Sequence, residues 1–157
     1  MLLSLDLSIS SPGIAIFSDS GSPELITSLQ TSSKDETKDR LKEIGNFLEE
    51  IKNQYKITEV AFERGFTRYN RSTQTLYEVL GVAMYIFHDY TQFFYAPSTI
   101  KKIVTGNGKS DKKIVEEYVL KMWPTLTFTD NDQSDACAVG MCHMIKTGKI
   151  KNGKYIQ

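Results

Sequence analysis

The sequence predicts one α/β domain, built on a mixed β-sheet with helices on its faces. Three short strand-like stretches joined by tight turns come first, a pattern typical of an antiparallel meander. Stretches of helical periodicity then alternate with further strands. With 157 residues, of which 40% are hydrophobic, the chain is long and apolar enough to bury a full core.

The predicted strands are bounded by residues that favour turns. Residues 10–13 (Ser-Ser-Pro-Gly) and 19–23 (Asp-Ser-Gly-Ser-Pro) separate the first three strands. Pro97 stops the last strand, because proline lacks the N–H group that a ladder needs. We therefore expect strands at residues 1–7, 13–17, 24–29, 58–63 and 92–96.

The predicted helices follow from apolar spacing and from capping residues. Apolar residues recur at helical spacing between positions 41 and 51, after a serine at position 32 or 33 that is the expected N-cap. Ser98, Ser110 and Asp132 are the expected N-caps of the three later helices, because a short side-chain oxygen can accept free backbone N–H groups. Helices are therefore expected at residues 33–51, 73–90, 98–104, 110–122 and from 132 onward.

The chain shows no internal repeat, so residues 1–147 are expected to form one domain, followed by a basic C-terminal tail at 148–157. No apolar run approaches the roughly 20 residues that a membrane helix needs. The first six residues have neither a basic lead-in nor a cleavage site, so no secretion signal is expected. Cys137 and Cys142 share one apolar helical stretch and are expected to be buried, reduced thiols of a cytoplasmic protein.

Charge is unevenly distributed along the chain. The formal net charge is zero, which by itself argues against a nucleic-acid-binding protein. Basic residues nevertheless gather in three stretches, at positions 64–71, 101–113 and 146–154. Basic patches around an acidic centre suit an anionic substrate held beside metal cations.

Four acidic residues stand out by their positions. Asp6 lies between two leucines in the first strand, and Glu63 ends its apolar strand; an unpaired carboxylate is costly in such a run. Asp132 and Asp135 lie three residues apart, on one face of the start of the last predicted helix. Each has an ordinary explanation: a helix cap for Asp132, or a strand-end acid that meets solvent or pairs with Arg64. For all four together, a converging metal site is the better explanation.

A site made of carboxylate oxygens suits Mg²⁺ or Mn²⁺ rather than zinc. Two such ions about 4 Å apart can activate a water and stabilise the leaving oxygen of an in-line phosphodiester displacement. His143 lies about 12 Å along the helix axis from Asp135, at the usual rise per residue, and is therefore expected to be structural or exposed.

Four blocks of the sequence resemble the RuvC Holliday-junction resolvases, and the resemblance extends to about Lys146. The blocks are Leu5-Asp6-Leu7, Phe62-Glu63-Arg64-Gly65-Phe66, Val104-Thr105-Gly106-Asn107-Gly108-Lys109-Ser110-Asp111-Lys112 and Asp132-Gln133-Ser134-Asp135-Ala136. The resemblance implies a ribonuclease-H-like fold, a homodimer, and paired Mg²⁺-dependent nicks in a four-way DNA junction.

The resemblance also assigns roles to individual residues. It implies that Asp6, Glu63, Asp132 and Asp135 are the catalytic, metal-binding acids, with two Mg²⁺ ions that Mn²⁺ can replace. It places the helix after Thr73 in the dimer-forming region. Phe66 matches an aromatic residue of a loop near the junction centre, where it could stack on an unpaired base; a loop aromatic packed on the core is an equal alternative. The DNA-contacting residues expected in all are Lys101, Lys109, Lys112, Phe66, Arg64, Arg68 and Arg71.

The sequence also departs from the family pattern. In the family a Pro-Gly turn follows the first aspartate directly, whereas here residues 7–11 come before Pro12-Gly13. The expected function is a structure-selective endonuclease in the cytoplasm of a bacterium or a phage-infected host, and the compact length suits a bacteriophage version. Two alternatives stay open: a less selective nuclease for forks and flaps, and a non-catalytic junction-binding protein.

Overall fold

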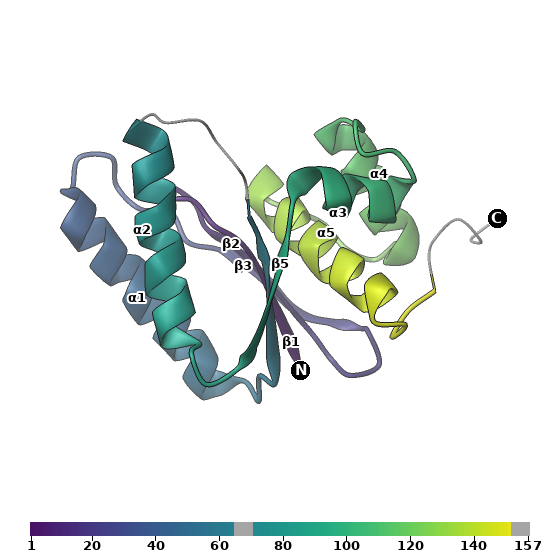
Figure 1. Cartoon of the computed structure of the whole chain (residues 1–157), viewed down its shortest axis with the longest axis horizontal. Helices are drawn as coiled ribbons and strands as arrows, with labels where there is room; N and C mark the ends of the chain where they lie inside the picture. The colour runs from purple at the N-terminus through teal and green to yellow at the C-terminus, as the bar shows by residue number, and fades with distance from the viewer. Residues whose placement is uncertain (65–70, 152–157) are drawn as a thin grey trace.

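Five strands form one mixed sheet, and helices cover both of its faces (Figure 1). This computed structural model describes residues 1–64 and 71–151, without the side chains of residues 71–73. The strands are β1 (Leu2–Asp6), β2 (Gly13–Phe17), β3 (Pro23–Ser28), β4 (Glu59–Glu63) and β5 (Thr91–Tyr95). The helices are α1 (Thr37–Gln54), α2 (Arg71–Ile86), α3 (Pro97–Thr105), α4 (Lys112–Met122) and α5 (Asn131–Lys146).

The strand order is β3-β2-β1-β4-β5. Strands β1, β2 and β3 pair antiparallel, whereas β4 pairs parallel with both β1 and β5. The predicted meander and mixed sheet are therefore confirmed. Since β1, β4 and β5 run in the same direction, the carboxyl ends of these three central and edge strands meet at one end of the sheet.

Side-chain alternation along the strands creates two cores. In β1, Leu3 and Leu5 belong to the core under α1 and α2, whereas Leu2 belongs to the core under α3, α4 and α5. The same alternation in β2 sends Ile14 and Ile16 to the first core. Figure 1 shows the two helical layers on opposite sides of the sheet.

This alternation also decides where two of the predicted acids face. Asp6 follows the parity of Leu2, and Glu63 follows the parity of Ala61, whose side chain lies in the core under α5. Both carboxylates therefore belong to the face of the sheet that α5 covers. The first turn of α5 carries the other two acids.

The helix starts differ from the predicted ones. Helix α1 begins at Thr37, after a turn in which the Asp35 N–H bonds to a serine carbonyl, and its N-cap is Glu36. Helix α3 begins with Pro97, whose missing N–H needs no cap, so Ser98 is not the N-cap. Ser110 is not a cap either, because its hydroxyl contacts the Thr105 hydroxyl at 2.7 Å.

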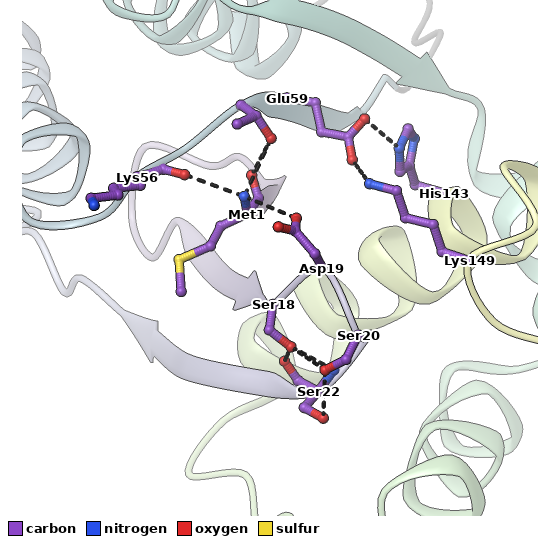
Figure 2. A network of polar contacts seen from close by, with 10 residues as sticks. Met1, Ser18, Asp19, Ser20, Ser22, Lys56, Glu59, His143 and Lys149 are labelled. Atoms are coloured by element: carbon purple, nitrogen blue, oxygen red, sulfur yellow. Dashed lines mark hydrogen bonds and ion pairs between the residues drawn. The ribbon is translucent and has the colours of Figure 1, made fainter.

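Both cysteines are buried and unpaired, as predicted. Trp123, at the end of α4, packs on Phe17 with ring centroids 5.2 Å apart. Lys149 lies in the predicted tail, yet it makes an ion pair with Glu59 at the start of β4 (Figure 2). The division of the chain at residue 147 stays a prediction, and residues 152–157 lie outside the described residues. No helix in the described ranges is long and apolar enough to span a membrane.

Candidate active site

The four predicted acids come from three elements that meet at one end of the sheet. The parallel register pairs Leu5 of β1 with Phe62 of β4, so the next residues, Asp6 and Glu63, come side by side. Helix α5 packs across β1 and β2 and brings its first turn to this end.

The N-cap of α5 is Asp130, not Asp132 as predicted. The Asp130 carboxylate accepts a hydrogen bond from the Gln133 backbone N–H at 2.9 Å, which satisfies one free donor of the first turn. Asp132 therefore lies inside the first turn, where it does not cap the helix. The shift has a consequence for the site, because Asp132 is left free to act with the other acids.

A cavity of about 150 Å³ opens beside these acids. Three of the four predicted carboxylates line it, together with two lysines and an apolar wall: Asp6, Glu63, Asp135, Lys101, Lys112, Pro97, Ile100, Val115 and Ala138. Asp132 does not line this cavity, although its charge acts on Asp6. The cavity is thus lined by charged groups and by an apolar wall.

Asp6 is the most perturbed acid of the cluster. Burial raises its pKa to about 8, and the negative charges of Glu63, Asp135 and Asp132 contribute in the same direction. Lys112 opposes this shift without cancelling it. Asp6 is therefore buried among negative charges, with too little positive charge nearby for it to ionise at the pH where a solvent-exposed aspartate would.

Glu63 and Lys112 complete the electrostatics of the cavity. Burial, followed by the charge of Asp135, raises the pKa of Glu63, although Lys112 and Lys101 oppose the shift. The ammonium of Lys112 donates to Asp135 Oδ2, and this hydrogen bond raises the pKa of Lys112. Lys112 was predicted as a DNA contact; the structure brings it into the acid cluster itself.

The donor chemistry of the cluster fits a hard divalent cation. Its candidate ligands are carboxylate oxygens, which Mg²⁺ and Mn²⁺ prefer, and their mutual repulsion would be relieved by a cation. Across the described ranges, no three His, Cys, Asp or Glu side chains are gathered tightly enough to form a ready-made metal site. The assignment of the four acids as metal ligands therefore stays a prediction.

The structure separates the predicted DNA-contacting residues. Lys101 lines the cavity, whereas Lys109 lies exposed in the turn between α3 and α4. Arg64 is exposed at the end of β4, with its guanidinium 5.6 Å from the centre of the Phe94 ring. Phe66 and Arg68 lie outside the described residues, as does the side chain of Arg71.

Sequence reasoning missed the residues that support the cluster. Gly13 and Ser28 continue the row that starts at Asp6, because Asp6 pairs with Gly13 and Gly13 pairs with Ser28. Gln133 lies buried between the two α5 acids in the sequence. The antiparallel pairing of neighbouring strands in the predicted meander is the signal that could have found the first two.

The strand order, the two helical layers and the carboxylates at the ends of β1 and β4 define the class of ribonuclease-H-like proteins. In agreement with this class, the structure superposes on Thermus thermophilus RuvC with a TM-score of 0.77, covering 94% of this chain and 96% of that chain at 19% identity. T. thermophilus RuvC in complex with Holliday junction substrate gives a TM-score of 0.83 over 93% of each chain, also at 19% identity.

The sequence relatives are more specific. The family model of crossover junction endodeoxyribonuclease RuvC matches residues 2–143. The enzyme of that name from Rickettsia bellii is 32% identical over 88% of this chain and 93% of its own length. Its counterpart from Orientia tsutsugamushi is 33% identical over 88% of this chain and 91% of its own length. The chain therefore belongs to the RuvC family.

Proposed function

We propose that this protein is an endodeoxyribonuclease that resolves four-way DNA junctions by divalent-metal-dependent hydrolysis of phosphodiester bonds. The observation that carries the proposal is the acid cluster, with Asp6, Glu63 and Asp135 around one cavity at the carboxyl ends of β1 and β4. The cluster sits in a chain whose relatives are named crossover junction endodeoxyribonucleases over nearly their full length.

Asp6, Glu63, Asp132 and Asp135 are the residues that would hold the metal, Mg²⁺ in the first place and Mn²⁺ as a substitute. When bound, two such ions supply an activated water and stabilise the leaving oxygen of the cleaved bond. The chain's own contribution is to hold the carboxylates rigidly, since Asp6 and Glu63 end buried strands and the α5 acids lie in a capped first turn.

Two lysines at the cavity balance the acids and favour an anionic substrate. Lys101 lines the cavity, and Lys112 donates to Asp135 from a side chain that is two-thirds exposed. A DNA phosphate that enters the cavity would therefore meet ammonium groups beside the carboxylates. Lys109 and Arg64, both exposed near the cavity end of the sheet, extend this basic surface along the DNA backbone.

A homodimer would supply the second active site that paired nicks require. Helix α2 exposes large apolar side chains on one face: Tyr77, Met84 and Tyr85, the last 78% exposed. Gly81 lies between them and has open space around it. A second copy of this helix is the occupant that would bury such a stripe, because like faces pack about a two-fold axis.

Two alternatives share this site. A less selective nuclease would use the same acids on forks and flaps, and a non-catalytic protein would use only the basic surface. The proposal places the reaction in the cytoplasm of a bacterium or a phage-infected cell, since the relatives named above are bacterial.

The test is cleavage of a synthetic four-way junction, with a linear duplex and a fork of the same sequence as controls. Wild-type protein and the Asp6→Asn variant are assayed with Mg²⁺ and with EDTA. We expect symmetric, metal-dependent nicks in the junction with the wild type alone. Equal cutting of the fork would move the function to a general branched-DNA nuclease. Binding without cutting in both Mg²⁺ and Mn²⁺ would refute the enzyme and leave a junction-binding protein.

A further inference from the structure

The start of α5 rests on a row of residues that crosses the sheet. Ser28, Gly13 and Asp6 are direct neighbours on β3, β2 and β1, because Ser28 pairs with Gly13 and Gly13 pairs with Asp6. Asp6 ends this row inside the acid cluster. The other two residues lie under the segment that carries Asp132, so the row links the position of that segment to the position of Asp6.

Gly13 provides the space for the α5 backbone. A Cβ atom at this position would lie 2.0 Å from the carbonyl oxygen of Asp132 and 2.5 Å from its carbonyl carbon. Both atoms are backbone, so they cannot rotate away as the end of a flexible side chain could. The backbone of Gly13 is ordinary extended strand, so the reason for glycine here is close approach rather than a left-handed conformation.

Ser28 and Gln133 hold the same segment in place through hydrogen bonds. The Ser28 hydroxyl donates to the Asp130 carboxylate, which also caps α5. The buried side chain of Gln133 donates to the Thr129 hydroxyl at 2.7 Å and accepts from the Thr129 N–H at 3.1 Å. Each of these bonds fixes the chain immediately before or within the first turn of α5.

We infer that Gly13 is a positioning residue that sets the distance of Asp132 from Asp6. The hydrogen bonds that join Ser28, Asp130 and Gln133 hold the start of α5 against Gly13. This inference rests on the proposed function, because it matters for catalysis only if the two aspartates bind metal together. A methyl group at position 13 must push the first turn of α5 away from the sheet. A displacement of about 1 Å is enough to impair a metal or catalytic site.

The test compares Gly13→Ala with a matched glycine-to-alanine substitution elsewhere in the same packing interface. Gly140, in the middle of α5, is also a close contact: a Cβ there would lie 2.3 Å from Cε2 of Phe17 and 2.8 Å from Oγ of Ser4. Those neighbours are side chains, and Gly140 lies two helical turns beyond Asp132. Gly140→Ala therefore introduces the same methyl group into the α5–sheet interface without acting directly on the first turn.

Three measurements are made on each full-length variant. Hydrogen exchange of residues 131–136 reports the first turn of α5, with residues 139–146 as the internal reference. The rise in melting temperature with added Mn²⁺ reports metal binding without DNA. The Mg²⁺ concentration for half-maximal junction cleavage reports the assembled site. We expect Gly13→Ala to speed exchange at 131–136. It should also raise, at least about fivefold, the Mn²⁺ concentration needed for thermal stabilisation and the Mg²⁺ concentration needed for half-maximal cleavage. Gly140→Ala should lower the melting temperature and leave both metal concentrations unchanged.

Equal effects of the two variants on metal binding would overturn the inference, because both would then act through general stability. Unchanged exchange at 131–136 in Gly13→Ala would overturn it as well. Gln133→Leu keeps the approximate volume and removes the side-chain hydrogen bonds of Gln133 to Thr129 and Ser28. It gives a second reading should Gly13→Ala not fold, with the same expected and contradicting results. If the wild type neither responds to Mn²⁺ nor cleaves, the proposed function fails, and hydrogen exchange alone decides whether Gly13 places the first turn.

Discussion

Asp6→Asn should abolish cleavage and at the same time stabilise the metal-free protein. The substitution keeps the size of the side chain and removes its negative charge. Burial and three neighbouring carboxylates raise the pKa of Asp6 from 3.8 to about 8, so its ionised form is unfavourable in the folded protein. A neutral amide removes that penalty, but it also removes an anionic ligand that a divalent cation needs.

The magnitude follows from the pKa difference between the folded and unfolded states. At pH 7 the unfolded carboxyl group is ionised and the folded one is mostly protonated, which costs about 4 kcal/mol of folding free energy at 1.36 kcal/mol per pH unit. Burial of the asparagine amide takes back part of this gain, so we expect a net stabilisation of about 2 kcal/mol. For a chain of this length, that raises the melting temperature by about 4–8 °C.

The sign of the pH dependence is specific. An acid whose folded pKa is raised contributes no penalty below its unfolded pKa, and the penalty grows as the pH rises towards the folded pKa. The melting temperature of Asp6→Asn should therefore be at or below that of wild type at about pH 4, where only the cost of the buried amide remains, and should rise relative to wild type up to about pH 8. Thermal unfolding in EDTA measures it, with Asp35→Asn as an exposed control that should change nothing.

Added Mg²⁺ should reduce the difference in melting temperature between Asp6→Asn and wild type, because the wild type gains binding free energy that the variant cannot gain. Junction binding should stay intact, because the folded Asp6 carboxyl group is already mostly protonated at pH 7 and the substitution adds no negative charge beside the DNA phosphates. An Asp6→Asn variant that melts below wild type in EDTA at pH 7 would refute the electrostatic reasoning. Substantial cleavage by the variant would remove Asp6 from the catalytic site.

Three further predictions concern other parts of the molecule. Lys112→Ala should weaken junction binding and lower the slope of log affinity against log salt by about one, as measured by fluorescence anisotropy; an unchanged slope would mean that this ammonium does not meet the DNA backbone. Burial lowers the pKa of His143, so its contribution to stability is full above about pH 6.5 and is lost as the pH falls. His143→Gln should therefore reduce the loss of unfolding free energy, measured with urea, between about pH 7 and 5. A parallel loss in both proteins would contradict this. Tyr85→Glu on α2 should lower the apparent mass in sedimentation from dimer to monomer, with the exposed Glu78→Gln as control; a variant that sediments as wild type would exclude this face as the dimer contact.

The sequence was sufficient for the sheet, and it singled out acids in two of the strands, because both features depend on local patterns. Apolar alternation between turn residues located all five strands, and carboxylates at the ends of apolar strands identified Asp6 and Glu63. The parity of each strand then determines which face its acids occupy. In the structure this parity places Asp6 and Glu63 on one face, since Leu2 and Ala61 share a core.

Helix starts were predicted less well because several residues competed for each cap. In the segment before α5, Asp130 and Asp132 are equally good caps by residue type, and the choice depends on Ser28, which lies 102 residues away in the sequence and donates to Asp130. Likewise, Ser110 satisfies its hydroxyl on Thr105 instead of capping α4. A tertiary contact, which a local pattern does not contain, decided the first case, and a local side-chain hydrogen bond between residues five apart decided the second.

Two glutamates on one strand explain why the cluster is suited to a cation. Glu59 and Glu63 lie on the same face of β4, and burial disfavours the charged form of each. At Glu59, the hydrogen bond from Lys149 and the charge of His143 outweigh burial, so its pKa is lowered; Figure 2 shows this carboxylate between the two partners. At Glu63, burial and then the negative charge of Asp135 outweigh the lysines, so its pKa is raised. One strand thus carries a neutralised glutamate at its start and an under-neutralised one at its end, and the second is the arrangement that a divalent cation would stabilise.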